Sequence, residues 1–177
     1  MELTSLQKEF NNCTLEYDLE KFNWPAWALS VVQEVAPQVT KLETLHEVLS
    51  PKEIVTVSRH VQNACSRKDF MERFDAFVAE YIPQRIDNKR YMIRRQGTLR
   101  VVIPNQASVG RRLAFHQGIF VGNGRGCRTI WTPFTEARGT NTMWMVDVEN
   151  SRRITKQIMA EKWSLEQIED ECLKHAF

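Results

Sequence analysis

The chain has 177 residues, of which 42% are hydrophobic and 26% charged, so it can bury one hydrophobic core as a single domain. A formal net charge of +2 gives no basic excess of the kind that binds nucleic acid or a membrane surface. The sequence has no apolar run of membrane-spanning length and no signal-peptide pattern at its start. The four cysteines are scattered without a CxxC pair, so we expect reduced thiols in a cytoplasmic protein.

The first half of the chain has helical patterns. Residues 1–50 predict an N-terminal helical arm, in which Pro25 suits the first turn of a helix over residues 26–36. The run Ser50-Pro51-Lys52-Glu53 is a capping box that predicts the start of the next helix, and the run from Ser66 to Asp69 resembles a further cap. Apolar residues then recur at helical spacing and predict an amphipathic helix that faces the core: Phe70, Met71, Phe74, Phe77, Val78 and Tyr81.

The hydrophobic period changes in the middle of the chain. Short runs rich in β-branched and aromatic residues, separated by loops with glycine, predict four strands over residues 98–103, 113–121, 128–134 and 142–148. Strands that follow one another without helices between them favour an antiparallel sandwich or barrel. A helical pattern returns after Asn150, with a second capping box at Ser164-Leu165-Glu166-Gln167. We therefore expect an α+β fold.

The glycine-rich run Gly122-Asn123-Gly124-Arg125-Gly126 invites comparison with a phosphate-binding loop. Such a loop needs a helix directly after its glycines, because the phosphate lies at the helix N-terminus. Here the following residues predict a strand, so a β-turn or bulge is the favoured interpretation.

His116 is the strongest candidate for chemistry. In an alternating strand it shares one face with the small residues Ala114 and Gly118, which leaves room for a ligand or a metal in front of the imidazole. Imidazole suits first-row transition metals. A core histidine with its hydrogen bonds satisfied is the alternative.

Four runs around His116 resemble the Fe(II)/2-oxoglutarate-dependent oxygenases of sporadic carbohydrate-biosynthesis gene clusters, which are similar to the phytanoyl-CoA hydroxylase group. The resemblance covers about residues 50–177. The runs that carry it are Phe115-His116-Gln117-Gly118, Gly122-Asn123-Gly124, Thr129-Ile130-Trp131-Thr132-Pro133-Phe134-Thr135 and Thr140-Asn141-Thr142-Met143-Trp144.

The resemblance implies a double-stranded β-helix of the jelly-roll or cupin-like kind. N-terminal helices would pack on it, and helices would follow at the C-terminal end. Residues 51–177 would then form a single oxygenase domain. Four strands do not close a jelly roll, so we expect a domain that is incomplete beyond Phe177. The implied reaction is oxidative decarboxylation of 2-oxoglutarate coupled to hydroxylation of a sugar or sugar-derived metabolite.

The resemblance implies that His116 is the first Fe(II) ligand, in a family whose iron site usually contains an HxD pair. The position of the aspartate is occupied by Gly118, which has no ligating atom. Glu136 or Asp147 are candidates for the missing carboxylate, or water or halide takes the position, as in the related halogenases. His175 lies in a helical pattern and is not assigned as the distal histidine.

Four further polar residues are candidates for holding 2-oxoglutarate or the substrate, with turn or surface roles as the alternative: Asn123, Arg125, Thr132 and Asn141. A basic run could bind an anionic sugar or sugar nucleotide, although a solvated surface is its default interpretation. This run consists of Arg85, Lys89, Arg90, Arg94, Arg95, Arg100, Arg111 and Arg112. Two other functions remain open: a non-catalytic jelly-roll module that binds carbohydrate, and a cupin-type metal-dependent isomerase or epimerase.

Overall fold

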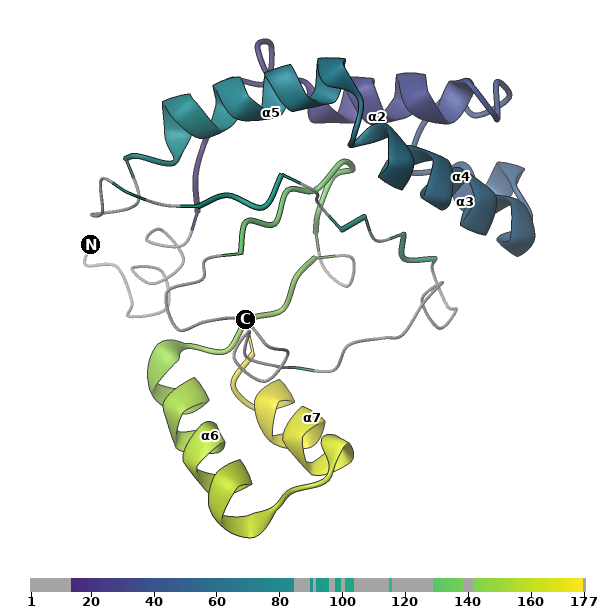
Figure 1. The fold of residues 1–177 in the computed structure, drawn as a ribbon. Helices are drawn as coiled ribbons and strands as arrows, with labels where there is room; N and C mark the ends of the chain where they lie inside the picture. The colour runs from purple at the N-terminus through teal and green to yellow at the C-terminus, as the bar shows by residue number, and fades with distance from the viewer. Residues whose placement is uncertain are drawn as a thin grey trace, which may run out of the picture. The chain divides into compact units, whose positions relative to one another are not determined.

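The structure is a computed structural model, and it describes residues 14–84, 90, 92–95, 98–99, 101–103, 115, 129–138 and 142–176. The chain divides into two compact units. The first, here called the helical unit, consists of Leu15–Arg111 and Thr132–Ala137. The second, here called the hairpin unit, consists of Met1–Thr14, Arg112–Trp131 and Arg138–Phe177. Figure 1 shows α2 to α5 of the helical unit and α6 and α7 of the hairpin unit.

The helical unit begins with α2, which spans Trp24–Gln33. The side chain of Asn23 caps the helix by accepting a hydrogen bond from the backbone N–H of Ala26 at 2.9 Å, and Pro25 lies in the first turn, as expected. One face of α2 is buried: Trp24, Trp27, Ala28, Val31 and Val32. The short helix α3 follows at Leu45–Val48. With five buried residues, α2 is part of the core of the helical unit.

Helix α4 spans Pro51–Ala64, and the predicted capping box is confirmed. The Ser50 backbone N–H donates to Glu53 Oε2 at 2.8 Å, and Ser50 Oγ accepts from the Glu53 backbone N–H at 3.4 Å. The helix buries Ile54, Val57, Val61 and Ala64. The sequence pattern therefore located the start of α4 correctly.

Helix α5 spans Lys68–Tyr81, and the prediction of a core-facing aromatic face is confirmed. Phe70, Phe77 and Val78 are buried, while Phe74 and Tyr81 pack against the core from partly buried positions. The expected cap at Ser66 is wrong, because Arg67 occupies the N-cap position and makes no side-chain capping hydrogen bond. Aromatic rings join α2 to α5, with centroids 4.6 Å apart for Trp27 and Phe70.

The hairpin unit contains α6 (Val148–Glu161) and α7 (Leu165–Leu173). Asp147 caps α6 by accepting from the Asn150 backbone N–H at 2.8 Å. The chain then turns at Lys162, whose φ of 53° is left-handed, and the predicted capping box of Ser164 and Gln167 starts α7. Beyond α7, Ala176 pairs with Val146 in an isolated antiparallel bridge, so the two ends of this segment meet.

The predicted α+β fold with a partial jelly roll is wrong for the part of the chain that the structure describes, which contains six helices and no sheet. The predicted strand over residues 113–121 lies outside the described residues except for Phe115. The other three runs are described, wholly or in part, and form no ladder. A run of strand-forming residues becomes a strand only when a second strand takes its backbone hydrogen bonds.

Two of these runs contact helices and not a second strand. Along residues 98–103 the Leu99 backbone N–H donates to Gln62 Oε1 of α4 at 2.6 Å. Ile103 is buried in the helical core, whereas Val102 is 66% exposed. In the run at 129–134, Phe134 lies edge-on to Trp27, with centroids 6.3 Å apart. Four apolar side chains of these runs therefore pack in or against the helical core: Leu99, Val101, Ile103 and Phe134.

Candidate functional site

The predicted site residues are not brought together among the residues that the structure describes. His116, Gly118, Asn123, Arg125 and Asn141 lie outside those residues. Thr132 is described and half-buried, and it lies in the helical unit. No group of three or more histidine, cysteine, aspartate or glutamate residues within the described ranges could hold a metal ion.

The two alternative carboxylates have different surroundings. Asp147 caps α6, and its two oxygens accept from the backbone N–H and the side-chain amide of Asn150 at 2.8 and 2.7 Å. The side-chain hydrogen bond from Asn150 is the main reason that the pKa of Asp147 is lowered. Glu136 is exposed and lies in the helical unit. Of the basic run, Arg95 forms an ion pair with Asp75 at 2.9 Å.

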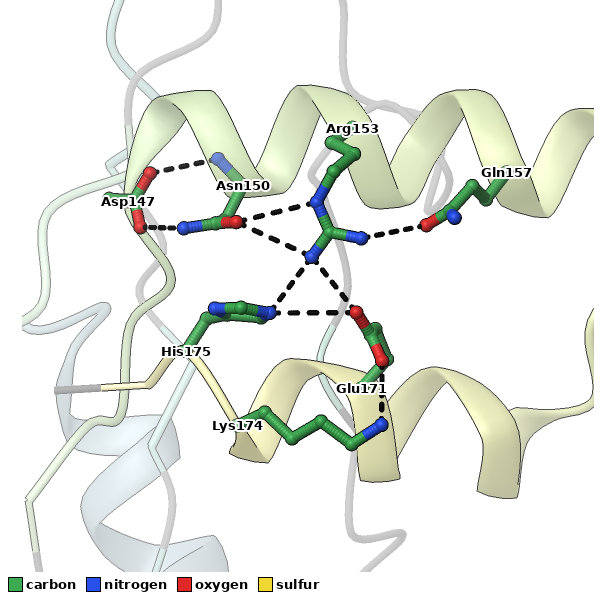
Figure 2. Close-up of polar contacts among 7 residues, drawn as sticks. All are labelled: Asp147, Asn150, Arg153, Gln157, Glu171, Lys174 and His175. Carbon is green, nitrogen blue, oxygen red and sulfur yellow. Dashed lines mark hydrogen bonds and ion pairs between the residues drawn. The ribbon is translucent and has the colours of Figure 1, made fainter.

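Among the described residues of the hairpin unit, the most connected polar group is centred on Arg153 of α6 and is shown in Figure 2. Its Nη2 donates to Glu171 Oε1 of α7 at 2.9 Å and to His175 Nε2 at 2.8 Å. Its Nη1 donates to Gln157 Oε1 at 3.0 Å, and its Nε to Asn150 Oδ1 at 3.4 Å. We call Arg153, Glu171 and His175 the hairpin cluster. It joins α6 to the residues after α7.

Glu171 is the acidic member of the hairpin cluster. Hydrogen bonds from Lys174 and then Arg153 lower the pKa of its carboxyl from 4.5 to about 2. Lys174 Nζ donates to Oε2 at 2.8 Å, and Arg153 uses Oε1. The carboxylate is therefore ionised at neutral pH, with one cation on each oxygen.

The helical unit contains a second group of the same three residue types. Arg67 holds Glu34 in a bidentate pair, with Nη1 2.6 Å from Oε1 and Nη2 2.7 Å from Oε2. His60 Nε2 lies 2.8 Å from Glu34 Oε2. Hydrogen bonds from Arg67 and then His60 lower the pKa of Glu34 to about 2. We call this group the helical-unit cluster. It connects the end of α2, helix α4 and the residue before α5.

Neither cluster was predicted from the sequence, although one signal for the hairpin cluster was present. The capping box at Ser164 places the start of α7 within a few residues of the end of α6, and so short a connection makes neighbouring helices antiparallel. Arg153 and Gln157 then share one face of α6, and Glu171 and His175 are four residues apart. The contact between these side chains depends on how the two helices pack, and the pattern of a single helix does not predict it.

Comparison of the chain with family models, curated proteins and solved structures found no match. None of the helices in the described part of the chain is both long and apolar enough to cross a membrane.

Proposed function

We propose that the protein is an Fe(II)/2-oxoglutarate-dependent oxygenase that hydroxylates a sugar or a sugar-derived metabolite in the cytoplasm. The observation that carries the proposal is the run Phe115-His116-Gln117-Gly118, together with the motifs that follow it up to Trp144. The scattered cysteines support the cytoplasmic location.

The described residues do not fit an iron site by themselves. Iron in such enzymes is held by two histidines and one carboxylate, which leave positions open for the co-substrate and oxygen. The described ranges contain no suitable group of ligands, and Gly118 has no donor atom. We therefore assign no catalytic step to the iron, and the proposal concerns His116 as its first ligand.

A second candidate function is sugar binding without catalysis. Gly118 favours it, because a glycine in place of the usual carboxylate removes a ligand that the oxygenase reaction needs. Under this alternative, sugar binding continues without iron and does not depend on His116.

The first experiment is an anaerobic titration of the full chain with Fe(II) and 2-oxoglutarate. The proposal predicts the visible charge-transfer band of the chelated complex, and predicts that His116→Ala abolishes it. His46→Ala is the matched control, because His46 lies in α3 of the helical unit and is not a candidate ligand. A folded chain without the band, or a band that persists in His116→Ala, would reject His116 as an iron ligand.

The variant Gly118→Asp separates the two candidate functions. If His116 binds iron, an aspartate two residues away adds a second ligand on the same face of an extended run. We expect Fe(II) affinity to rise by roughly tenfold or more, because loss of even an outer-shell partner of a metal ligand typically costs about ten- to a hundredfold in affinity. Isothermal titration calorimetry with Fe(II) under anaerobic conditions measures this. Equal affinities for the variant and the native chain, with sugar binding retained in both, would favour the binding function.

A further inference from the structure

The protonation state of His175 follows from its contacts. Its Nε2 lies 2.8 Å from Arg153 Nη2 and 3.5 Å from Glu171 Oε1 (Figure 2). A guanidinium can only donate hydrogen bonds, so Nε2 must accept through its lone pair. The ring is therefore neutral, and its proton is on Nδ1.

The helical-unit cluster has the same residue types with the opposite proton arrangement. His60 Nε2 is 2.8 Å from Glu34 Oε2 and 3.4 Å from Arg67 Nη2. An ionised carboxylate only accepts hydrogen bonds, so Nε2 of His60 carries a proton. Protonation of His60 at Nδ1 keeps this hydrogen bond and adds a charge that attracts Glu34. The chain thus contains an internal control for His175.

Protonation strengthens the contacts of His60 but weakens those of His175. A proton on Nε2 removes the acceptor that Arg153 uses and places two cationic groups in contact. The charged groups in contact with the ring are Arg153 of α6 and Glu171 of α7. Two more charged groups lie one contact further away: Lys174, which is bonded to Glu171, and the α6 cap Asp147, which is linked to Arg153 through Asn150. Both Glu171 oxygens already pair with a cation, so a protonated ring would compete with Arg153 for Oε1.

The position of His175 gives this change a structural consequence. The next residue, Ala176, forms the antiparallel bridge with Val146, which directly precedes the Asp147 cap of α6. The hydrogen bond from Arg153 to His175 therefore lies one residue away from the bridge.

We propose that His175 is a pH-sensitive latch of the hairpin unit. The neutral ring accepts from Arg153 and holds residues 175–176 against α6 and Val146. Protonation of His175 breaks that hydrogen bond, and Ala176 is then released from its bridge with Val146. Acidification would therefore open the latch.

The latch is tested by nuclear magnetic resonance on the full chain. Two-bond ¹⁵N–¹H spectra at about pH 8 report which ring nitrogen carries the proton. We expect a proton on Nδ1 of His175 and on Nε2 of His60. A proton on Nε2 of His175 at that pH would overturn the proposal, and this reading needs no variant.

Hydrogen exchange tests the consequence for the bridge. Between about pH 8 and about pH 5, and after correction for the intrinsic exchange rate, we expect those backbone amides of residues 145–147 and 175–176 that are protected at pH 8 to lose about tenfold of that protection, the effect of one hydrogen bond to a charged group. His175→Gln, which stays neutral, should keep the same protection at both pH values, whereas His60→Gln should behave as the native chain. Equal losses in the native chain and in His175→Gln would overturn the latch.

Discussion

At the residue scale, Glu34 shows how one exposed carboxylate can organise a helix junction. It accepts two hydrogen bonds from Arg67 and one from His60, and the three residues come from three separate segments of the helical unit. A surface ion pair ordinarily contributes little, but bidentate geometry and a shared partner make this one specific.

The lowered pKa of Glu34 predicts how this contribution depends on pH. Because the folded state lowers the pKa of the carboxyl from 4.5 to about 2, its contribution is complete above about pH 4.5 and is lost as the pH falls through about 2. We expect Glu34→Gln to lower the melting temperature at pH 7 by about 1–3 °C and to have a much smaller effect at about pH 2. Thermal unfolding followed by circular dichroism measures both.

The matched control for this prediction is Glu43→Gln, which removes the same charge from an exposed residue between α2 and α3. It should change the melting temperature less than Glu34→Gln at pH 7. A deficit in Glu34→Gln that is just as large near pH 2 would show that the carboxylate charge is not the cause.

At the element scale, two serines have opposite roles in α4, one at its N-cap and one inside it. Ser50 caps the helix and exchanges hydrogen bonds with Glu53, which also lower the pKa of that carboxyl. Ser58 lies inside the helix, and its hydroxyl donates back to the carbonyl of Ile54 at 2.7 Å. The first role stabilises the helix, and the second does not.

The same substitution at the two serines should therefore give different results. Ser50→Ala removes the cap and should lower the free energy of unfolding by about 1 kcal/mol. Ser58→Ala replaces a poorer helix former and should leave it unchanged within about 0.5 kcal/mol. Urea unfolding of both variants gives the comparison. Equal losses would mean that the capping box contributes nothing specific.

The elements predicted correctly are those whose hydrogen bonds are local. Ser50, Ser164 and the aromatic face of α5 identify helices because caps and helical spacing act within a few residues. The runs at 98–103 and 129–134 have strand-forming residues, but a strand needs a distant partner that these runs do not specify. The Leu99 backbone N–H donates to the Gln62 side chain of α4 and not to a second strand.

The candidate site divides in the same way. The sequence indicated His116 because a histidine within an apolar run is unusual. His116 and most of the residues around it lie outside the described residues. The cluster of Arg153, Glu171 and His175 was missed because it forms only when two helices pack together. Single-helix patterns place each side chain on a face but do not say which partner that face meets.

At the scale of the whole molecule, the two units differ in the size of their cores. Among the described residues, the core cluster of the helical unit contains 20 buried side chains, from Phe22 to Ile103. The buried hydrophobic residues of the hairpin unit in those ranges are Ile154 and Cys172. Burial of apolar surface is the main favourable term in folding, so the two units should differ in how often they open.

Each unit contains a buried cysteine that can report its opening. Cys65 in the helical unit and Cys172 in the hairpin unit are both 6% exposed, and burial raises the pKa of both thiols. A thiol reagent can therefore react with either residue only when the surrounding structure opens. We expect Cys172 to react faster than Cys65 under native conditions, by at least about tenfold, because fewer apolar contacts must be broken.

Peptide mass spectrometry separates the two labelling rates, and replacement of Cys13 and Cys127 by serine removes the competing thiols. In urea strong enough to unfold the whole chain, Cys65 and Cys172 should react at similar rates, which controls for their intrinsic reactivity. If Cys65 reacted as fast as Cys172 without denaturant, the two units would open together. Faster labelling confined to Cys172 would establish that the helices with the hairpin cluster open while the core around Phe22, Ile54 and Phe77 stays closed.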